Sequence, residues 1–155
     1  MEPSSLQLGW ASRDITPDRP VNLCGQFHMR ISQGVLDPVT VTALSLSTGD
    51  DAVIWVSCDL VQVPNDVLTA CRALLRQRRP EIPAEKLILS ATHTHTAPDP
   101  FGAWHPPVPP GVMPAAEFQA FLTERIVDAV VESWQARRPG SVCWGYGYAV
   151  VGHNR

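Results

Sequence analysis

The chain has 155 residues, of which 45% are apolar and 17% charged, and its 12 basic and 15 acidic side chains give a net charge of −3. This length suits one domain over residues 1–155, and the apolar content excludes an intrinsically disordered chain. No run approaches the roughly 20 apolar residues of a membrane-spanning helix. A nucleic-acid partner is also excluded, because a surface that follows phosphates needs clustered Lys and Arg.

Four widely spaced cysteines, Cys24, Cys58, Cys71 and Cys143, form no Cys-x-x-Cys pair and no metal-ligand spacing. Cys58 and Cys71 lie within apolar runs, where a free thiol behaves as a small buried hydrophobic side chain. Residues 1–10 have neither the cationic start nor the apolar stretch of a signal peptide. We therefore expect a cytoplasmic protein with reduced cysteines.

Three strands are predicted in the first part of the chain, at residues 6–11, 39–46 and 52–58. A proline-containing turn at residues 13–17 follows the first of them. The second strand alternates β-branched and small polar residues, which is typical of a half-buried strand. The turn at residues 49–51 joins it to a nearly continuous apolar run, which predicts a hairpin whose second strand is covered on both faces.

A helix is predicted after Pro64, with Asn65 as its N-cap. Arginines crowd its last turn, where cations meet the negative end of the helix dipole, and Pro80 ends it. Residues 86–91 then form another short apolar strand. The order strand, helix, strand predicts a right-handed βαβ crossover with parallel pairing.

A proline-rich stretch at residues 98–114 interrupts the regular pattern, and a segment of this kind in a compact domain is usually functional or mobile. A second helix begins near Ala115 and carries an apolar stripe up to Arg137 and Arg138. Residues 142–151 predict a last strand. The expected fold class is therefore α/β, with a mixed sheet, a βαβ crossover and two main helices.

The segment Thr92-His93-Thr94-His95 follows an apolar strand directly. In extended backbone, side chains two residues apart point to the same face. His93 and His95 are therefore expected to face one spot at the carboxyl end of a strand, where open α/β sheets place their ligands. Neutral imidazole is a common zinc ligand, although one histidine can instead orient the other or a bound water.

Two known arrangements of this motif do not fit. A metallo-β-lactamase needs Asp two residues after its His-x-His pair and then a further His, but Ala97 and Pro98 occupy those places. Amidohydrolase barrels carry a His-x-His near their first strand, whereas here three predicted strands precede it. A chain of 155 residues is also too short to close such a barrel.

Six segments along the chain form an ordered series. They are Gly9-Trp10-Ala11-Ser12-Arg13-Asp14-Ile15-Thr16-Pro17, Asn22-Leu23-Cys24-Gly25-Gln26, Asp37-Pro38, Val56-Ser57-Cys58-Asp59-Leu60, Thr92-His93-Thr94-His95 with Pro98, and Asn154-Arg155. In this series and its spacing the chain resembles, over its whole length, the N-terminal part of the neutral/alkaline, non-lysosomal ceramidase family.

This resemblance implies a zinc amidase that hydrolyses the N-acyl bond of ceramide or of a related lipid or small amide. His93 matches the family's zinc-binding histidine, and His95 matches its neighbour in the active site. Arg155 matches an arginine at the substrate pocket, and Gly25 lies on a loop that approaches the site closely. The family's Ser-Gly-Pro continuation is absent, since Thr96-Ala97-Pro98 stands there.

Two further residues are candidates for the substrate pocket. Asp59 ends an apolar strand, where a carboxylate is either functional or bonds the backbone amides of a turn. Trp104 lies in the proline-rich stretch and either lines a lipid pocket or belongs to an apolar surface that a partner covers.

The family's other zinc ligands, a second histidine with Glu and Tyr, would lie beyond residue 155. The resemblance therefore implies an incomplete portion of a larger α/β hydrolytic domain, whose C-terminal part is the expected partner. From these 155 residues alone we expect weak zinc binding and negligible turnover. The alternative is a non-catalytic remnant, or half of a split assembly, that acts as a protein-binding domain.

Overall fold

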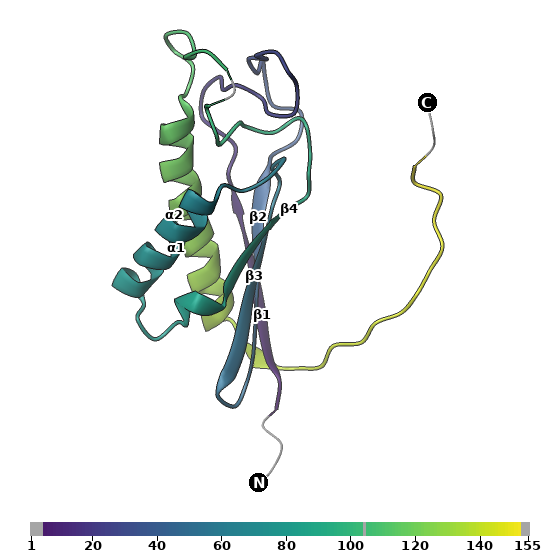
Figure 1. The fold of residues 1–155 in the computed structure, drawn as a ribbon. Helices are drawn as coiled ribbons and strands as arrows, with labels where there is room; N and C mark the ends of the chain where they lie inside the picture. Colours follow the sequence, from purple (N-terminus) through teal and green to yellow (C-terminus); the bar gives the residue numbers. More distant parts are fainter. Residues whose placement is uncertain (1–4, 104, 153–155) are drawn as a thin grey trace.

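The computed structural model describes residues 5–103 and 105–152. Five strands form one sheet in the order β4-β3-β2-β1-β5, and both long helices lie on the same side of it (Figure 1). The elements are β1 (Gln7–Asp14), β2 (Thr40–Thr48), β3 (Asp51–Cys58), α1 (Asn65–Arg78), the short 3-10 helix η1 (Ala84–Lys86), β4 (Leu87–Ala91), α2 (Ala115–Gln135) and β5 (Arg138–Pro139).

The sheet is mixed, as the sequence predicts. β2 pairs with β1 and with β3 in antiparallel register, whereas β4 lies parallel to β3 after the crossover through α1. Because β3 and β4 run in the same direction, their carboxyl ends, Cys58 and Ala91, are register partners. The segments that follow these two strands therefore begin side by side, and one of them carries the paired histidines.

Helix α2 supplies most of the packing against β1 and β2. Its residues Phe118, Leu122, Ile126 and Val130 recur every four positions and are fully buried, as a stripe on one helix face requires. Cys58 and Cys71 are also fully buried free thiols. Burial raises the pKa of each to about 12 and keeps both protonated.

Two local boundaries differ from the predictions. Helix α1 has Pro64 at its N-cap position and no side-chain capping bond, so Asn65 is the first helical residue instead of the cap. Strand β1 continues to Asp14, because every residue from Gln7 onward finds a partner in β2. The turn after it is held by the Thr16 N–H, which donates to Asp14 Oδ1 at 2.7 Å, and hydrogen bonds from Thr16 lower the pKa of Asp14.

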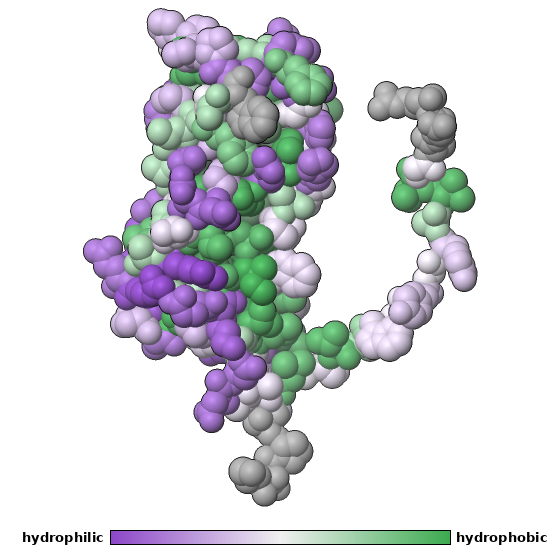
Figure 2. Space-filling model, viewed as in Figure 1, coloured by the Kyte–Doolittle hydropathy of each residue, from purple (hydrophilic) through white to green (hydrophobic). Residues whose placement is uncertain are grey.

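The prediction that the strand at 52–58 is covered on both faces is wrong. Both helices pack on one face, and the other face of the sheet is open. Trp10, Leu44, Trp55 and Ile88 are successive register partners across four strands, so their side chains form one row on this open face. Trp10 is 66% exposed, Trp55 54% and Ile88 49%. Figure 2 shows hydrophobic residues gathered along the strands, while hydrophilic residues cover the helical side.

The predicted strand at 142–151 is also wrong. β5 ends at Pro139, and residues 140–152 contain no strand. The reason lies in the register: Leu8 pairs with Arg138 and Gln7 with Pro139, and the Gly140 N–H donates to the Leu6 carbonyl. If β5 continued in this register, residues after Gly140 would lie beyond the first residue of β1. The alternating apolar residues at 142–151 therefore have no part of β1 to pair with. Figure 1 shows this segment leaving the body of the molecule.

Neither long helix in the described ranges has the combination of length and apolar character that crossing a membrane requires.

Candidate metal centre

The two histidines follow β4 but are not part of it. The strand ends at Ala91, and His93 has a φ of 65°, in the left-handed region. Its backbone N–H donates to the Leu60 carbonyl at 2.9 Å, and Thr92 donates to the Cys58 carbonyl at 3.0 Å. The segment after β3 thus holds the segment after β4. The prediction that an extended strand aligns the two side chains is therefore wrong about the backbone.

The two imidazoles nevertheless converge. His93 Nε2 and His95 Nε2 are 3.4 Å apart, and the ring centroids are separated by 5.0 Å at an interplanar angle of 81°. Each Nδ1 faces a backbone carbonyl: that of His93 lies 2.8 Å from Val61 O, and that of His95 lies 3.0 Å from Gly25 O. A carbonyl only accepts, so each Nδ1 donates, and in the neutral form of each ring the lone pair of Nε2 is turned toward the other ring.

Two imidazole lone pairs that face each other can coordinate one cation between them. A separation of 3.4 Å is long for a direct N–H···N bond, which prefers about 2.7–3.2 Å. Two nitrogen ligands at about 2.0–2.1 Å on a tetrahedral ion stand about 3.3–3.4 Å apart. Both rings are exposed and accessible from solvent. The arrangement fits two of the ligands of a zinc ion.

Gly25 lies directly against His95. Its φ is +98°, and a Cβ on this residue would be 2.5 Å from both Cγ and Nδ1 of the His95 ring. Only glycine therefore allows the backbone carbonyl to reach Nδ1 from this side. In the structure the group that Gly25 approaches is the His95 imidazole, and its place at a substrate pocket stays a prediction.

Asp59 accepts hydrogen bonds from one backbone amide and two side-chain hydroxyls. Its Oδ2 accepts from the N–H and from the hydroxyl of Thr40, both at 2.9 Å, and its Oδ1 accepts from Thr92 Oγ1 at 3.3 Å. These bonds tie the end of β3 to the start of β2 and to the histidine segment. Because Asp59 also lines the cavity beside the histidine segment, its two predicted roles stay predictions. Arg155 and Trp104 lie outside the described residues.

A buried polar network of Asn22, Asp99 and His105 is not predicted from the sequence. Asp99 is 3% exposed, and its Oδ2 accepts from Asn22 Nδ2 at 3.1 Å and lies 3.5 Å from His105 Nδ1. Burial, followed by the charge of Asp99, raises the pKa of Cys24. Asn22 and Asp99 are 77 positions apart, so no local spacing signals their contact. The network fixes the start of the proline-rich stretch.

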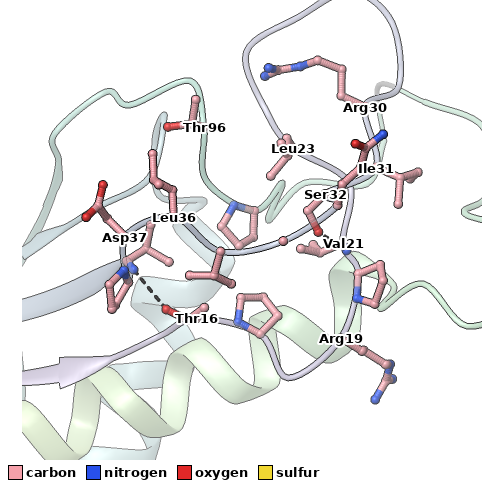
Figure 3. A pocket seen from close by; sticks show the side chains of 18 of the residues that line it. Thr16, Arg19, Val21, Leu23, Arg30, Ile31, Ser32, Leu36, Asp37 and Thr96 are labelled. Atoms are coloured by element: carbon pink, nitrogen blue, oxygen red, sulfur yellow. Dashed lines mark hydrogen bonds between the residues drawn. The ribbon is translucent and has the colours of Figure 1, made fainter.

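A cavity of about 1070 Å³ lies beside the histidine segment. Thr94, Thr96 and Asp59 contribute to its wall, and residues of the loop between β1 and β2 supply most of the rest (Figure 3). Neither His93 nor His95 lines it. The cavity and the two Nε2 atoms are therefore separate features of this end of the sheet.

A complete metal site is not present within residues 5–103 and 105–152, because no three His, Cys, Asp or Glu side chains there are grouped to hold an ion. Within these ranges the paired histidines stand as two converging imidazoles without a third such side chain grouped with them.

The fold is shared with part of a neutral ceramidase from Pseudomonas aeruginosa, at a TM-score of 0.75 and 18% sequence identity. A second structure, a ceramidase complexed with C2, superposes at a TM-score of 0.71 and also 18% identity. In both cases the similarity covers 88% of this chain and 22% of the ceramidase chain. No protein-family model matches the sequence, and no curated protein does.

This chain therefore has the fold of one portion of a ceramidase. It spans about a fifth of the length of the ceramidases it matches. The predicted α/β class, with a mixed sheet and two main helices, is confirmed. The resemblance to the ceramidase family is supported by the fold and by no match of sequence.

Proposed function

We propose that this chain supplies the paired-histidine portion of a zinc-dependent amide hydrolase of the neutral ceramidase type. The observation that carries the proposal is that the two Nε2 atoms lie 3.4 Å apart while each Nδ1 is hydrogen-bonded to a backbone carbonyl. Support also comes from the fold shared with ceramidases.

Each residue of the pair has a defined task in this proposal. His93, held through its backbone N–H and its ring by Leu60 and Val61, is the zinc ligand. His95 presents its Nε2 to the same point and either completes the grip on the ion or orients a water and carries its proton. When bound, zinc polarises the carbonyl of an amide and supplies a nucleophilic water at neutral pH.

The proposed substrate is an N-acyl amide, either ceramide-like or a smaller amide. The proposed partner is the rest of a larger catalytic domain, of which residues 1–155 form the N-terminal part and which supplies the missing ligands. A catalytic zinc needs about three protein ligands and one open position, so two histidines alone bind weakly and turn over little.

Zinc titration of the purified chain, free of any histidine tag, tests the proposal. The wild-type chain is expected to bind one ion per chain weakly, as measured by competition with a chromogenic chelator. His93→Ala is expected to abolish saturable binding. His95→Ala is expected to weaken it by at least about tenfold, since losing even a supporting partner of a metal ligand costs about 10–100-fold. His28→Ala is the matched control, because His28 is exposed and lies outside the pair.

The outcomes are distinguishable. Loss of binding in His93→Ala and not in His28→Ala supports the metal role. Equal affinity in wild type, His93→Ala and His95→Ala would remove it. A defect confined to His93→Ala would make His93 the ligand and leave His95 the proton-handling role.

The open sheet face favours a second candidate, a protein-binding domain. Trp10 and Trp55 expose more than half of their surface in one cross-strand row, and an aromatic side chain buries about 150–250 Å² at an interface. Leu8, Leu46 and Val53 form a second apolar row beside it. Contiguous exposed apolar residues of this kind are a common mark of a protein-binding surface.

A second copy of the chain is the simplest probe of this face. The wild-type chain is expected to self-associate with rising concentration in sedimentation velocity, and the Trp10→Thr/Trp55→Thr double variant to sediment as a monomer at the same concentrations. Phe27→Thr removes an even more solvent-exposed aromatic residue outside the sheet and is expected to behave as wild type. A monomeric wild-type chain, or a double variant that associates equally well, would count against the sheet face as a binding surface.

A further inference from the structure

Arg30 connects two segments that lie far apart in the sequence. Its backbone is anchored at both ends, since its N–H donates to Asn22 Oδ1 at 3.0 Å and its carbonyl accepts from the Leu23 N–H at 2.7 Å. Its side chain then reaches out of the loop between β1 and β2. The Nη2 donates to the Cys24 carbonyl at 2.8 Å and to the His95 carbonyl at 2.5 Å. One guanidinium nitrogen therefore ties the loop to the histidine segment.

The Arg30 guanidinium bonds the chain at the point where the backbone pairing between the loop after β1 and the histidine segment ends. The Asp99 N–H donates to the Asn22 carbonyl at 2.8 Å, and the Cys24 N–H donates to the Ala97 carbonyl at 3.0 Å. Continued in steps of two, this antiparallel ladder would next pair Gln26 with His95. Gly25, with its φ of +98°, turns the loop away, and among the described residues no backbone N–H bonds the His95 carbonyl. Arg30 supplies the missing donor.

The hydrogen bond between His95 Nδ1 and the Gly25 carbonyl depends on the Arg30 side chain at both of its ends. His95 Nδ1 bonds the Gly25 carbonyl, and that peptide group follows directly on Cys24. Arg30 holds the Cys24 carbonyl on one side and the His95 carbonyl on the other. The Nε of Arg30 is buried and has no partner within the described parts of the chain, which is unfavourable for a charged donor. Its two carbonyl bonds keep it in place.

We propose that Arg30 is a positioning residue, which keeps the Gly25 carbonyl on His95 Nδ1 and thereby directs the lone pair of His95 Nε2 toward His93. Its link to metal binding rests on the proposed function, but its effect on the tautomer does not. A lysine keeps the charge but lacks the planar fork of donors, so it restores the bridge only in part. An uncharged chain of similar length cannot bridge the carbonyls at all.

Two readouts test this role on the full chain. Long-range ¹H–¹⁵N correlation spectra at alkaline pH, where free imidazole is neutral, report the tautomer of His95. Wild type is expected to show the Nδ1–H form, Arg30→Met a mixture of both forms, and Arg30→Lys an intermediate. Zinc affinity is expected to fall by about tenfold or more in Arg30→Met and by less in Arg30→Lys. Arg19→Met is the control, because Arg19 pairs with Glu117 and lies away from His95.

The outcomes separate this proposal from the metal function. An unchanged His95 tautomer in a folded Arg30→Met overturns it. If Arg30→Met fails to fold, Arg30→Lys decides by the same spectra, and a wild-type tautomer with wild-type zinc affinity in that variant overturns the proposal. A shifted tautomer in a chain whose wild type binds no zinc supports the positioning role and rejects the zinc proposal. A shift in Arg19→Met as large as in Arg30→Met also overturns it.

Discussion

Replacing Gly9 by alanine is expected to lower the free energy of unfolding by about 3 kcal/mol, at the upper end of the usual cost of overpacking. Gly9 lies in β1 on the face that α2 covers. A Cβ there would be 2.3 Å from the Ser133 carbonyl oxygen and 2.7 Å from the Arg137 nitrogen. Both are backbone atoms, one in the last turn of α2 and one just after the helix, so no side-chain rotation relieves the clash, and the end of the helix must move off the sheet.

Urea denaturation followed by circular dichroism measures this effect. Gly34→Ala is the matched control, since nothing lies within 4 Å of a Cβ at Gly34. Its free energy of unfolding is expected to stay within about 0.5 kcal/mol of wild type. A Gly9→Ala chain as stable as Gly34→Ala would show that α2 does not pack on β1 as closely as the structure places it.

The sequence predicts which segments form helices and strands better than it predicts which of their faces and edges are covered by other elements. Hydrophobic period and proline positions give the hairpin of β2 and β3, the crossover through α1, and the start of α2 at Ala115, all of which are confirmed. Whether both faces of β3 are covered depends on where the helices pack, and no local pattern of residues records that. The alternation at 142–151 has the period of a strand, but pairing also needs a free edge, which the register of β5 denies it.

The candidate site shows the same division. A spacing of two residues predicts that His93 and His95 approach each other, and their rings do so. The cause is different: the left-handed backbone of His93 and its bond to Leu60 set the geometry, and an extended strand does not. The groups that hold the rings, Gly25 and Arg30, come from 70 and 65 positions away. Spacing within one segment carries no information about such supports.

Replacing Gly25 by alanine is expected to dismantle the histidine pair while leaving the fold intact. The new Cβ would lie 2.5 Å from the His95 ring, and the φ of +98° is unfavourable for any side chain. Because His95 is exposed, its ring can rotate into solvent and away from this Cβ. The contact with the His95 Cβ, at 2.9 Å, requires in addition a small shift of the exposed loop backbone. The bond from Nδ1 to the Gly25 carbonyl is then lost, and Nε2 no longer faces His93. Zinc affinity is expected to fall to the level of His95→Ala.

Gly111→Ala separates the two causes of this loss. Gly111 also has a positive φ, 84°, but nothing lies within 4 Å of a Cβ there. Both variants bear backbone strain of about 1–2 kcal/mol, and only Gly25→Ala displaces a ring. We therefore expect similar melting temperatures for the two, wild-type zinc affinity in Gly111→Ala, and loss of the His95 Nδ1–H signal in Gly25→Ala alone. Wild-type zinc binding by Gly25→Ala would mean that His95 does not need this carbonyl, and the pair would then owe its geometry to His93 and its support from the segment after β3.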